Sequence, residues 1–566
     1  MNNIKLKLLI VLYLICEFVI AQPTIISFTP ASGTVGTIVT IVGTNFNPID
    51  SNNVVFFGAS KGKVSYATSD SIRVAVPIGA IYHPISVTNL FTHLTAYSTL
   101  PFIVTYICTN SFSSSSFEGH TNFSNGDPTY CVKIADLDGD GKPDLIVPDP
   151  QTGQISILKN TSSFGNISFI VGNNWSTNYL SFAVGNAPYF VSIGDLDGDG
   201  KPDIAIANRG DTTISILRNQ SAIGWISFAP KVDFRIGTTA NPYPGSLDIG
   251  DIDGDGKPDI AVPNETDANV SVLKNTSTVG HISFASRINY SLPSVGESTL
   301  IEDLDGDGKP EMIVGGNMIS VFKNTSTLGV ISFSPRVDYY VGNQPSSIYI
   351  GDLNGDGKQE IVSADWGSDS VSVLKNECTI GTILFDTTRN FAVGIQPNNV
   401  TIGDLNGDGK PDLVTVNNYG NGISLLENTC TSAIISFAPK MDLITEQIPT
   451  FVSIGDMDAD GEADIVVANF EPNTTSVLRN QNCSRIIKVL DNPLLYPNPT
   501  STEFTILTTG EIINEIKVFN VLGYEIIDIF ENGKSATIDI QFLVKGIYFV
   551  IINTEKSTYR RKVIKE

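Results

Sequence analysis

A nine-residue acidic loop that occurs seven times limits the fold of this chain more than any other feature. The first copy reads DLDGDGKPD and runs directly into the apolar LIV. The copies are spaced 49 to 59 residues apart and begin at Asp136, Asp195, Asp251, Asp303, Asp352, Asp404 and Asp456. Such a period indicates one supersecondary unit per copy, because a single unit cannot bury its own apolar face and must pack against its neighbours.

The residues around each loop predict β-strands. Phrases such as VSIGD precede the loop, phrases such as DIAIA end it, and then come ISILRN-like phrases and a short ISF. Each phrase alternates with period two and is rich in Val and Ile, which is typical of strands. Four antiparallel strands in roughly 50 residues suit a propeller blade, and seven copies can close a ring. We therefore predict an all-β chain with a seven-bladed β-propeller over residues 106–486.

The oxygen-bearing side chains of the loop predict a metal site. Positions 1, 3, 5 and 9 are acidic or amide in every copy, and position 6 is always glycine. Carboxylates about 4 Å apart repel one another by about 4 kcal/mol at an effective dielectric near 20. A bound divalent cation reverses this repulsion, and Ca²⁺ takes six to eight oxygen ligands. Acidic turns without a metal are the alternative interpretation.

The loop is not an EF-hand, because position 12 offers no acidic ligand and the flanking phrases predict strands rather than helices. The motif D-x-D-x-D-G-x-x-D between strands instead resembles the FG-GAP/VCBS repeat of integrin-α-type propellers. That resemblance covers all seven copies. It implies structural Ca²⁺ at about seven sites, held by the side chains at positions 1, 3, 5 and 9 and the main-chain carbonyl at position 7.

Applied to this sequence, the resemblance implies the following metal ligands: Asp136, Asp138, Asp140, Lys142 and Asp144; Asp195, Asp197, Asp199, Lys201 and Asp203; Asp251, Asp253, Asp255, Lys257 and Asp259; Asp303, Asp305, Asp307, Lys309 and Glu311; Asp352, Asn354, Asp356, Lys358 and Glu360; Asp404, Asn406, Asp408, Lys410 and Asp412; Asp456, Asp458, Asp460, Glu462 and Asp464.

Some copies depart from the pattern. Asn354 and Asn406 replace Asp at position 3, which removes one carboxylate and predicts weaker cation affinity. Glu311 and Glu360 lengthen the side chain at position 9, and Ala459 stands where the other copies have glycine. We expect the copy that begins at Asp352 to be the weakest, because it has both the amide and the longer acid.

The N-terminal part of the chain contains two segments of other kinds. Residues 1–21 combine two lysines with the apolar run LLIVLYLICEFVIA, a pattern that predicts a secretory signal peptide. Residues 22–105 contain P-x-I-x-S-x-x-P, G-x-x-G-T-x-V-T-I-x-G-x-N-F and a late V-x-V-P. This segment resembles the IPT/TIG immunoglobulin-like domain, which implies a β-sandwich that serves as a spacer or contact module.

The last 80 residues, 487–566, carry no acidic loop and end in a basic segment. They contain Y-P-N-P, a V-x-N-x-x-G core, G-I-Y and a Lys/Arg-rich final strand. The segment is similar to the C-terminal sorting domain of type IX secretion cargo. The resemblance implies a small C-terminal β-sandwich, the type IX secretion machinery as a partner, and a place outside a Gram-negative cell, either attached to its surface or released.

The net charge limits the classes of partner that this chain is expected to bind. The formal net charge of −24 argues against nucleic acid or an anionic membrane as a partner. No segment beyond the signal peptide is long and apolar enough to span a membrane.

Five cysteines remain after the signal peptide, so at least one is unpaired within the chain, and Cys108 with Cys131 is the one pairing that we single out. Asn-x-Ser/Thr triplets at Asn160, Asn275 and Asn324 are expected to be chance occurrences.

Two function classes remain open from the sequence. The four histidines, His83, His93, His120 and His281, are expected to be ordinary surface or turn residues, and the common hydrolase motifs are absent. We therefore expect a non-catalytic adhesin or a module that binds an extracellular glycan or protein. A lyase-like polysaccharide-active enzyme is the alternative, and a surface-layer scaffold without a ligand is a third possibility. Residues 111–119 or 485–489 are expected to close the ring.

Overall fold

The computed structural model describes residues 22–106, 111–170, 180–237, 243–481, 494–496, 500, 502–508, 511–521 and 523–565. These residues form an all-β protein whose helical elements are two short 3₁₀ turns, η1 (Asp50–Asn52) and η2 (Ser114–Ser116). The chain forms two compact units, residues 1–480 and 481–566. The predicted signal peptide, residues 1–21, lies outside the described residues, as do Cys108, Cys483 and the segment 485–489.

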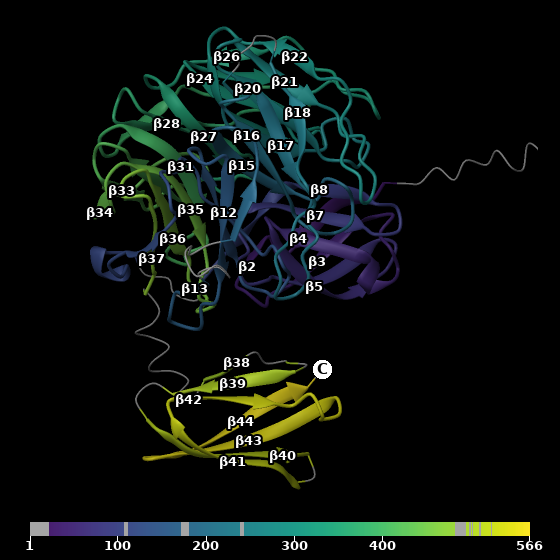
Figure 1. Ribbon diagram of the computed structural model, residues 1–566, viewed down its shortest axis with the longest axis vertical. Helices are drawn as coiled ribbons and strands as arrows, with labels where there is room; N and C mark the ends of the chain where they lie inside the picture. The colour runs from purple at the N-terminus through teal and green to yellow at the C-terminus, as the bar shows by residue number, and fades with distance from the viewer. Residues whose placement is uncertain are drawn as a thin grey trace, which may run out of the picture. The chain divides into compact units, whose positions relative to one another are not determined.

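The N-terminal sandwich of the first unit is drawn in purple in Figure 1. Its strands pair in the order β1-β3-β6-β5-β4-β7-β8-β2. Phe57 and Phe102 are fully buried at its centre, with their rings edge to face and 5.2 Å apart. The strands are β1 (Thr24–Thr29), β2 (Ser32–Gly33), β3 (Ile38–Thr44), β4 (Asn53–Phe57), β5 (Ser60–Ala67), β6 (Ser71–Ala75), β7 (His83–Asn89) and β8 (Leu94–Val104).

In the repeat region the described residues form seven antiparallel sheets, of which six have four strands and the first has five. The innermost strands are β10 (Lys133–Ala135), β15 (Pro188–Gly194), β19 (Asp248–Gly250), β23 (Gly296–Glu302), β27 (Pro345–Gly351), β31 (Pro397–Gly403) and β35 (Pro449–Gly455). The second strands are β11 (Asp144–Asp149), β16 (Asp203–Asn208), β20 (Asp259–Asn264), β24 (Glu311–Gly316), β28 (Glu360–Asp365), β32 (Asp412–Asn417) and β36 (Asp464–Asn469).

The third strands are β12 (Gln154–Asn160), β17 (Thr213–Leu217), β21 (Asn269–Leu273), β25 (Ile319–Phe322), β29 (Ser370–Leu374), β33 (Gly422–Leu426) and β37 (Thr474–Leu478). The outer strands are β14 (Leu180–Ala183), β18 (Val232–Arg235), β22 (Ile288–Ser291), β26 (Val337–Tyr339), β30 (Arg389–Ala392), β34 (Met441–Ile444) and, in the last sheet, β9 (Thr121–Ser124). A short strand β13 (Phe169–Ile170) also pairs with β12 in the first sheet. Every residue of each second strand is buried between neighbouring sheets.

The sheets are arranged as the blades of a ring. Each innermost strand contacts that of the next sheet, and β35 of the last sheet contacts β10 of the first. Strand β9, which precedes the first loop in the sequence, completes the last sheet by pairing with β37. Phe117 bridges to Asn480 just outside this pair. The closing strand is therefore residues 121–124, directly after the predicted segment 111–119, which supplies the bridging phenylalanine instead.

The short ISF phrase is not the fourth strand, contrary to our prediction. In five blades its phenylalanine forms an isolated bridge to the asparagine just after the third strand, as in Phe228 with Asn219, and the outer strand follows later. In the first blade the equivalent Phe169 belongs to the short strand β13. The ring of the ISF phenylalanine packs edge to face on an aromatic ring from the outer strand of the preceding blade. The ring centroids are 4.7 to 5.1 Å apart in six such pairs: Phe123–Phe169, Phe182–Phe228, Phe234–Phe284, Tyr290–Phe333, Tyr339–Phe385 and Phe391–Phe437.

An asparagine at the end of each third strand fastens one blade to the next. In the third blade, Nδ2 of Asn275 donates to the carbonyl of Pro258 in its own loop at 2.8 Å and to that of Leu196 in the preceding loop at 2.9 Å. Asn160 makes the equivalent bond across the ring closure, to Met457 at 2.9 Å. We call this set the asparagine clasp: Asn160, Asn219, Asn275, Asn324, Asn376, Asn428 and Asn480.

The clasp also settles the Asn-x-Ser/Thr triplets at Asn160, Asn275 and Asn324. All three side chains are at most 2% exposed, and their amide nitrogens donate hydrogen bonds. They cannot accept a glycan in the folded protein.

The second unit is a small sandwich of two sheets, drawn in yellow in Figure 1. One sheet has the order β38 (Leu494–Tyr496), β39 (Glu503–Leu507), β42 (Ser535–Asp539). The other has the order β41 (Glu525–Gly533), β40 (Ile513–Asn520), β43 (Gly546–Thr554), β44 (Thr558–Lys565). Phe504, Ile516 and Val550 are fully buried between the sheets. The predicted basic final strand is β44, and it lies at a sheet edge.

The asparagine clasp predicts a specific stability effect. Asn275→Ala leaves two buried carbonyls without their donor, and we expect it to lower the free energy of unfolding by about 2 to 4 kcal/mol. The denaturant midpoint of the mature protein measures the change. Asn166→Ala, at an exposed hairpin position, is the matched control and should change stability by less than about 0.5 kcal/mol. Equal effects of the two substitutions would contradict the role of the clasp.

Candidate metal centres

Each acidic loop connects the innermost strand of a blade to its second strand and is shaped by its own carboxylates. In the first loop, the two oxygens of Asp136 accept the N–H groups of Gly139 and Gly141 at 2.9 and 3.0 Å. Oδ1 of Asp138 accepts the N–H of Asp140 at 3.1 Å. The glycine at position 6 has φ between 82° and 86° in all seven loops, a region that side chains disfavour. Ala459 adopts φ 60° at position 4 of the last loop, where the first loop has Gly139 at 73°.

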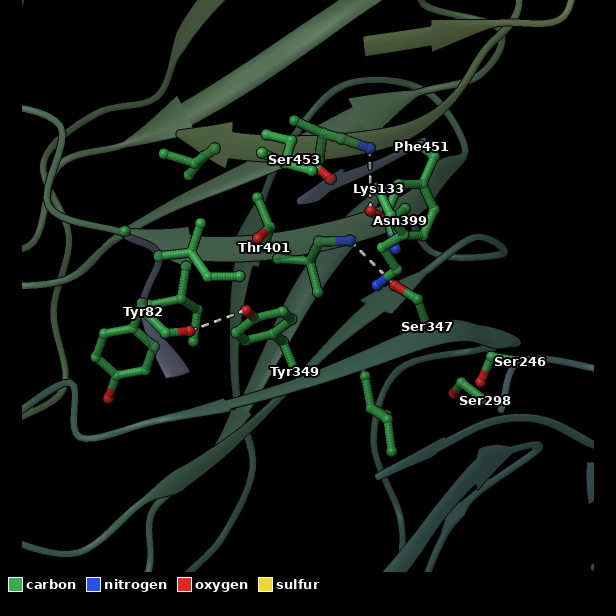
Figure 2. Close-up of a pocket in the computed structure, with 18 of the residues that line it drawn as sticks. Tyr82, Lys133, Ser246, Ser298, Ser347, Tyr349, Asn399, Thr401, Phe451 and Ser453 are labelled. Atoms are coloured by element: carbon green, nitrogen blue, oxygen red, sulfur yellow. Dashed lines mark hydrogen bonds between the residues drawn. The ribbon is translucent and has the colours of Figure 1, made fainter. Parts of the chain in front are cut away.

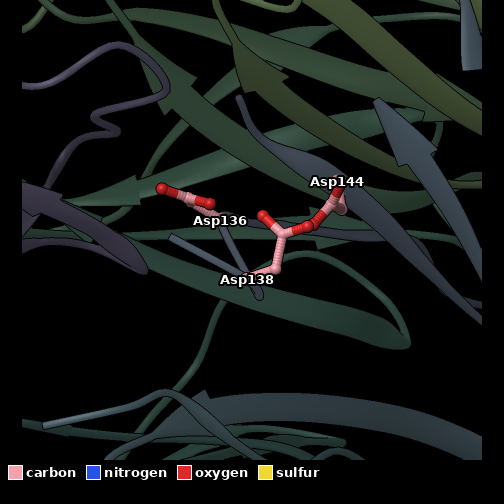
Figure 3. Close-up of side chains that lie close together, drawn as sticks. All are labelled: Asp136, Asp138 and Asp144. Atoms are coloured by element: carbon pink, nitrogen blue, oxygen red, sulfur yellow. The ribbon is translucent and has the colours of Figure 1, made fainter. Parts of the chain in front are cut away.

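The loops bring carboxylates together, as Figure 3 shows for Asp136, Asp138 and Asp144. In each of five loops, three acidic side chains place one oxygen each within 4.8 Å of the others. Oxygens at such separations can share one ion at about 2.4 Å, the distance for a hard divalent cation. The groups are Asp136, Asp138 and Asp144; Asp195, Asp197 and Asp199; Asp251, Asp253 and Asp255; Asp303, Asp305 and Glu311; Asp456, Asp458 and Asp460.

The loops that begin at Asp352 and Asp404 do not bring three acidic groups together in this way among the described residues. In both, position 3 is an amide, Asn354 or Asn406, whose Oδ1 accepts the N–H of position 5 as the aspartate does elsewhere. The loop shape is thus retained while one negative charge is lost. These are the two copies for which the sequence predicts weaker affinity.

Position 9 links the loop to the asparagine clasp. Its carboxylate accepts the N–H of position 2 and the N–H of the clasp asparagine, at 3.2 and 2.9 Å for Asp144. The longer Glu311 and Glu360 reach the clasp N–H at 3.4 Å. The extra methylene therefore shifts the carboxylate relative to the clasp, as the sequence suggested.

The position 7 lysines turn their ammonium groups away from the carboxylates. Lys142 donates to the carbonyl of Ser162 at 2.9 Å, and Lys201, Lys257, Lys309 and Lys410 bond equivalent hairpin carbonyls. These side chains therefore brace the hairpin between the third and outer strands. Any contribution of position 7 to a metal site comes from its backbone.

Burial makes the loop carboxyls hard to ionise without a cation. It raises the pKa of Asp136 and Asp404 to about 6 and that of Asp195, Asp251 and Asp456 to about 7, with neighbouring carboxylates adding to the shift. Burial also raises the pKa of Glu311 and Glu360 to about 8. Carboxyls in this state favour a bound proton or a bound cation.

The structure reveals counter-cations that the sequence analysis missed. A basic residue at the end of the third strand reaches the carboxylates at positions 3 and 5, as Lys159 does with Asp138 and Asp140. Arg218, Lys274, Lys323 and Arg479 do the same in four other blades. The signal was the recurrent Lys or Arg in the phrases ISILKN and ISILRN.

The two blades with an amide at position 3 lack this arrangement. Lys375 pairs with Glu377 instead, at 2.6 Å. In the sixth blade the basic residue is replaced by Glu427, whose carboxylate lies 3.5 Å from Nδ2 of Asn406. Loss of the position 3 carboxylate and loss of its counter-cation therefore occur together, which indicates that the basic residue serves the acidic pair.

The N-terminal sandwich lies against several of the loops. Gln22 donates to Oδ2 of Asp251 at 2.8 Å, and the N–H of Thr95 donates to the carbonyl of Gly256 at 2.8 Å. The N–H of Asp352 donates to the hydroxyl of Tyr82 at 2.9 Å. His93, expected to be an ordinary turn residue, contacts the carbonyl of Gly198 through Nδ1 at 2.9 Å. The sandwich is therefore docked on the loop face of the ring.

The cysteines of the described residues are not cross-linked. Cys131, Cys378 and Cys430 are buried free thiols. Cys378 and Cys430 each accept a hairpin N–H at the position where other blades have serine, such as Ser277. The predicted pairing of Cys131 with Cys108 involves a residue that lies outside the described residues.

Comparison with protein-family models gives three matches. The FG-GAP-like repeat matches residues 195–262, 303–363, 352–415 and 404–467. The IPT/TIG domain matches residues 23–101, and the secretion system C-terminal sorting domain matches residues 494–566. The three matches confirm the three resemblances found in the sequence. No curated protein matches the chain.

Several solved structures resemble the chain distantly. A protein from Lactobacillus plantarum is 15% identical with a TM-score of 0.41 and covers 70% of this chain and 98% of its own. An Agrocybe aegerita protein described as recognising non-reducing terminal N-acetylglucosamine is 17% identical with a TM-score of 0.37, at 76% and 98% coverage. An auxiliary nutrient binding protein from Bacteroides thetaiotaomicron is 10% identical with a TM-score of 0.31, at 81% and 98% coverage. These scores are too low to carry a functional inference.

The raised pKa values predict pH-dependent cation binding. Protons compete for the same oxygens, so the Ca²⁺ affinity of the mature protein should weaken as the pH falls through 7 and 6. In the presence of a chelator, the stability of the folded protein has the opposite dependence on pH. A carboxyl whose pKa is raised in the folded state binds protons more tightly there, so the free energy of unfolding should fall as pH rises from about 4 to 7. Calorimetric Ca²⁺ titrations and denaturant midpoints across this range test both. Affinity that does not change with pH would contradict the loops as the binding sites.

The counter-cation predicts a gain of affinity on its removal. In Lys274→Met the carboxylates of Asp253 and Asp255 lose their ammonium partner, so the Ca²⁺ affinity of that loop should rise while the protein in chelator becomes less stable. Calcium titration and thermal melts with and without chelator measure the two effects. Lys231→Met, which removes a lysine paired with Asp233 on an outer strand, is the control and should change neither.

Proposed function

Because this chain carries FG-GAP-like repeats between a TIG domain and a type IX secretion sorting domain, we propose that it is a calcium-stabilised, non-catalytic binding protein. The sorting domain marks it for export to the cell surface or the extracellular space. Among the described residues, none forms a helix with the length and apolarity needed to cross a membrane. The observation that carries the calcium assignment is the repeated cluster of buried carboxylates at the loop end of the blades.

Calcium suits the donor set and the location. The clusters offer carboxylate oxygens without thiolate or imidazole, and hard oxygen ligands favour Ca²⁺ or Mg²⁺ over softer metals. Extracellular modules bind Ca²⁺ at about 10⁻⁴ to 10⁻³ M, near its concentration outside cells. The side chains at positions 1, 3, 5 and 9 would hold the ion, which acts as a structural link between the first two strands of a blade.

The face of the ring opposite the sandwich supports a binding role. Antiparallel strands place the connections between the second and third strands, and those between blades, at the end away from the metal loops. These connections expose aromatic side chains, including Tyr419 at 66% and Tyr340 at 77%. Arg209 stacks on the ring of Tyr189 at 3.5 Å on the same face. Exposed aromatic and guanidinium groups on loops held by a rigid scaffold are typical of ligand-binding surfaces.

A polysaccharide-active enzyme, lyase-like in mechanism, is the second candidate. The observation that favours it is a cavity of about 150 Å³ lined by Lys133, Asp248, Glu302 and Tyr349. These side chains include groups that can act as a general base or acid. Lyase chemistry removes the proton next to a uronic acid carboxyl and leaves an unsaturated sugar.

Calcium removal should loosen the first unit. Each loop site at tenfold excess of Ca²⁺ over its Kd contributes about 1.4 kcal/mol to the folded state. We expect a chelator to lower the melting temperature of the mature protein and to increase hydrogen exchange in strands β10, β15 and β19, next to the loops. The C-terminal unit contains none of these loops and is the internal control. An unchanged melting temperature at saturating chelator would contradict a structural role for calcium.

Binding and turnover can be separated in one experiment. The mature protein is applied to a glycan array and a panel of extracellular proteins, and then incubated with the same polysaccharides, each with calcium and with chelator. Saturable calcium-dependent binding without new reducing ends or unsaturated sugars supports the binding protein. Product formation would overturn it in favour of the enzyme. If neither binding nor turnover is observed, the surface-layer scaffold is the interpretation that remains.

A further inference from the structure

A cavity runs along the axis of the ring, between the innermost strands of the blades. Its volume is about 160 Å³. Figure 2 shows its lining, with Lys133, Ser298, Ser347, Asn399 and Phe451 among the labelled side chains. These residues come from different blades, so the cavity exists only when the ring is closed.

The sandwich forms the floor of this cavity. Ala80, Ile81 and Tyr82 line it at the loop end. There the hydroxyl of Tyr82 accepts the N–H of Asp352 at 2.9 Å, and the main-chain carbonyl of Tyr82 accepts the hydroxyl of Tyr349 at 3.4 Å. At the other end the lining includes Tyr130 and Tyr189, whose ring centroids are 5.1 Å apart. The cavity is therefore a blind pocket. It can accept the end of a polymeric ligand, but such a polymer cannot thread through it.

The wall nearest the mouth carries polar groups with hydrogen-bonding capacity left over. Ser246 accepts the N–H of Thr299 at 2.9 Å, and Ser347 accepts that of Val400 at 3.0 Å, so the hydroxyl hydrogen of each serine can donate to a ligand. The hydroxyl of Ser298 is buried and has no hydrogen-bond partner among the described residues. Hydroxyl and amide groups beside aromatic rings are the chemistry that recognises sugars.

One cation breaks the sevenfold symmetry of the pocket. Three residues before each loop, the innermost strands present Lys133, Ser192, Asp248, Leu300, Tyr349, Thr401 and Ser453. The ammonium of Lys133 lies 4.9 Å from the ring centre of Phe190 and 5.0 Å from that of Phe451. Within the described parts of the chain, Lys133 makes no ion pair. A cation held between two aromatic faces and without a carboxylate partner is available to an anionic ligand.

Asp248 and Glu302 line a neighbouring cavity with Lys133 rather than this pocket. Asp248 accepts the N–H of Ile301 at 2.8 Å through one oxygen, which leaves the other to accept a hydrogen bond. Glu297 lines the pocket at its mouth, beside Tyr189. Lys133 is therefore the one cation among the described residues that line this pocket, beside the acids Glu297 and Asp404 and several hydrogen-bond acceptors.

We propose that this blind pocket binds the terminal uronic acid residue of an extracellular glycan, with the sugar carboxylate paired to the ammonium of Lys133. The sugar hydroxyls bond Ser246, Ser298, Ser347 and Asn399, and the next sugar stacks on Tyr130 and Tyr189 at the mouth. This inference rests on the proposed binding function and assigns it a site and a ligand class. The pocket volume, about that of one sugar ring, limits entry to a single terminal residue.

The test compares short oligo-uronides with the same oligosaccharides after reduction of their carboxyls to neutral sugars. Calorimetry on the calcium-loaded mature protein should show that Lys133→Met weakens uronide binding about tenfold or more, the size of one charge-assisted hydrogen bond. Lys133→Arg should retain most of the affinity. Lys440→Met, at a lysine paired with Asp442 outside the pocket, is the control and should leave affinity unchanged.

A second variant keeps the test valid if Lys133→Met fails to fold. Asn399→Asp is nearly isosteric, keeps the oxygen that accepts the N–H of Val452 at 3.2 Å, and adds a negative charge to the pocket wall. It should weaken binding of the uronides about tenfold more than it weakens binding of the reduced oligosaccharides. Uronides capped with a neutral sugar at the end that enters should lose binding in the unmodified protein.

The outcomes separate this inference from the proposed function. Uronide affinity that is unchanged in Lys133→Met and Asn399→Asp, or equal for capped and uncapped chains, would overturn the pocket while leaving binding elsewhere on the ring intact. Tighter binding of peptides through a free C-terminal carboxylate would also overturn the assignment to sugars. Absence of any glycan or protein ligand for the mature chain would overturn both.

Discussion

The carboxylates gathered at the loop end of each blade are the constraint on which the rest of the structure depends. Three to five acids lie in each nine-residue turn, and burial together with mutual repulsion opposes their ionisation. Two sets of contacts within the fold partly compensate the negative charge of these acids. Backbone N–H groups of the same loop bond their oxygens, and in five blades a lysine or arginine from the third strand reaches positions 3 and 5. A divalent cation would complete a network that the chain has partly neutralised, so its binding is expected to fasten an existing loop rather than to fold one.

The loops also hold the ring together, because the same residues serve the blade and its neighbour. Position 9 bonds the backbone of the clasp asparagine, and that asparagine bonds the position 2 carbonyl of the preceding loop. Between these polar links, the phenylalanine of each ISF phrase packs on an aromatic ring of the preceding blade. Both kinds of contact also occur where the ring closes between the last and first blades, in Asn160 with Met457 and in Phe123 with Phe169. Geometry at the metal loop is thereby transmitted to the interface between blades.

Sequence patterns predict this architecture well wherever the physics is local. Period-two runs of Val and Ile specify the buried second strands, and alternating acids with a glycine at position 6 specify the loop, because both depend on neighbouring residues. The misassigned ISF strand and the unseen roles of Lys159 and Asn160 depend instead on partners about 20 residues away or in another blade. The position of the sandwich on the loop face follows from contacts such as Gln22 with Asp251, which are more than 200 residues apart in the chain. A repeat pattern contains no information about such contacts.

The docked sandwich connects the metal loops to the axial pocket. Tyr82 lies in the floor of that pocket, and its hydroxyl accepts the N–H of Asp352, the first residue of a metal loop. Gln22 and Thr95 of the sandwich bond the loop that begins at Asp251. The loop that begins at Asp352 is therefore linked directly to the pocket floor, whereas the loop that begins at Asp251 contacts sandwich residues outside the pocket lining. The loop at Asp352 has an amide at position 3, and Lys375 pairs with Glu377 instead of this loop, so it is one of the two loops for which weaker cation affinity is expected. Under the proposed function, calcium binding at that loop would act on the pocket floor through the hydrogen bond between Asp352 and Tyr82.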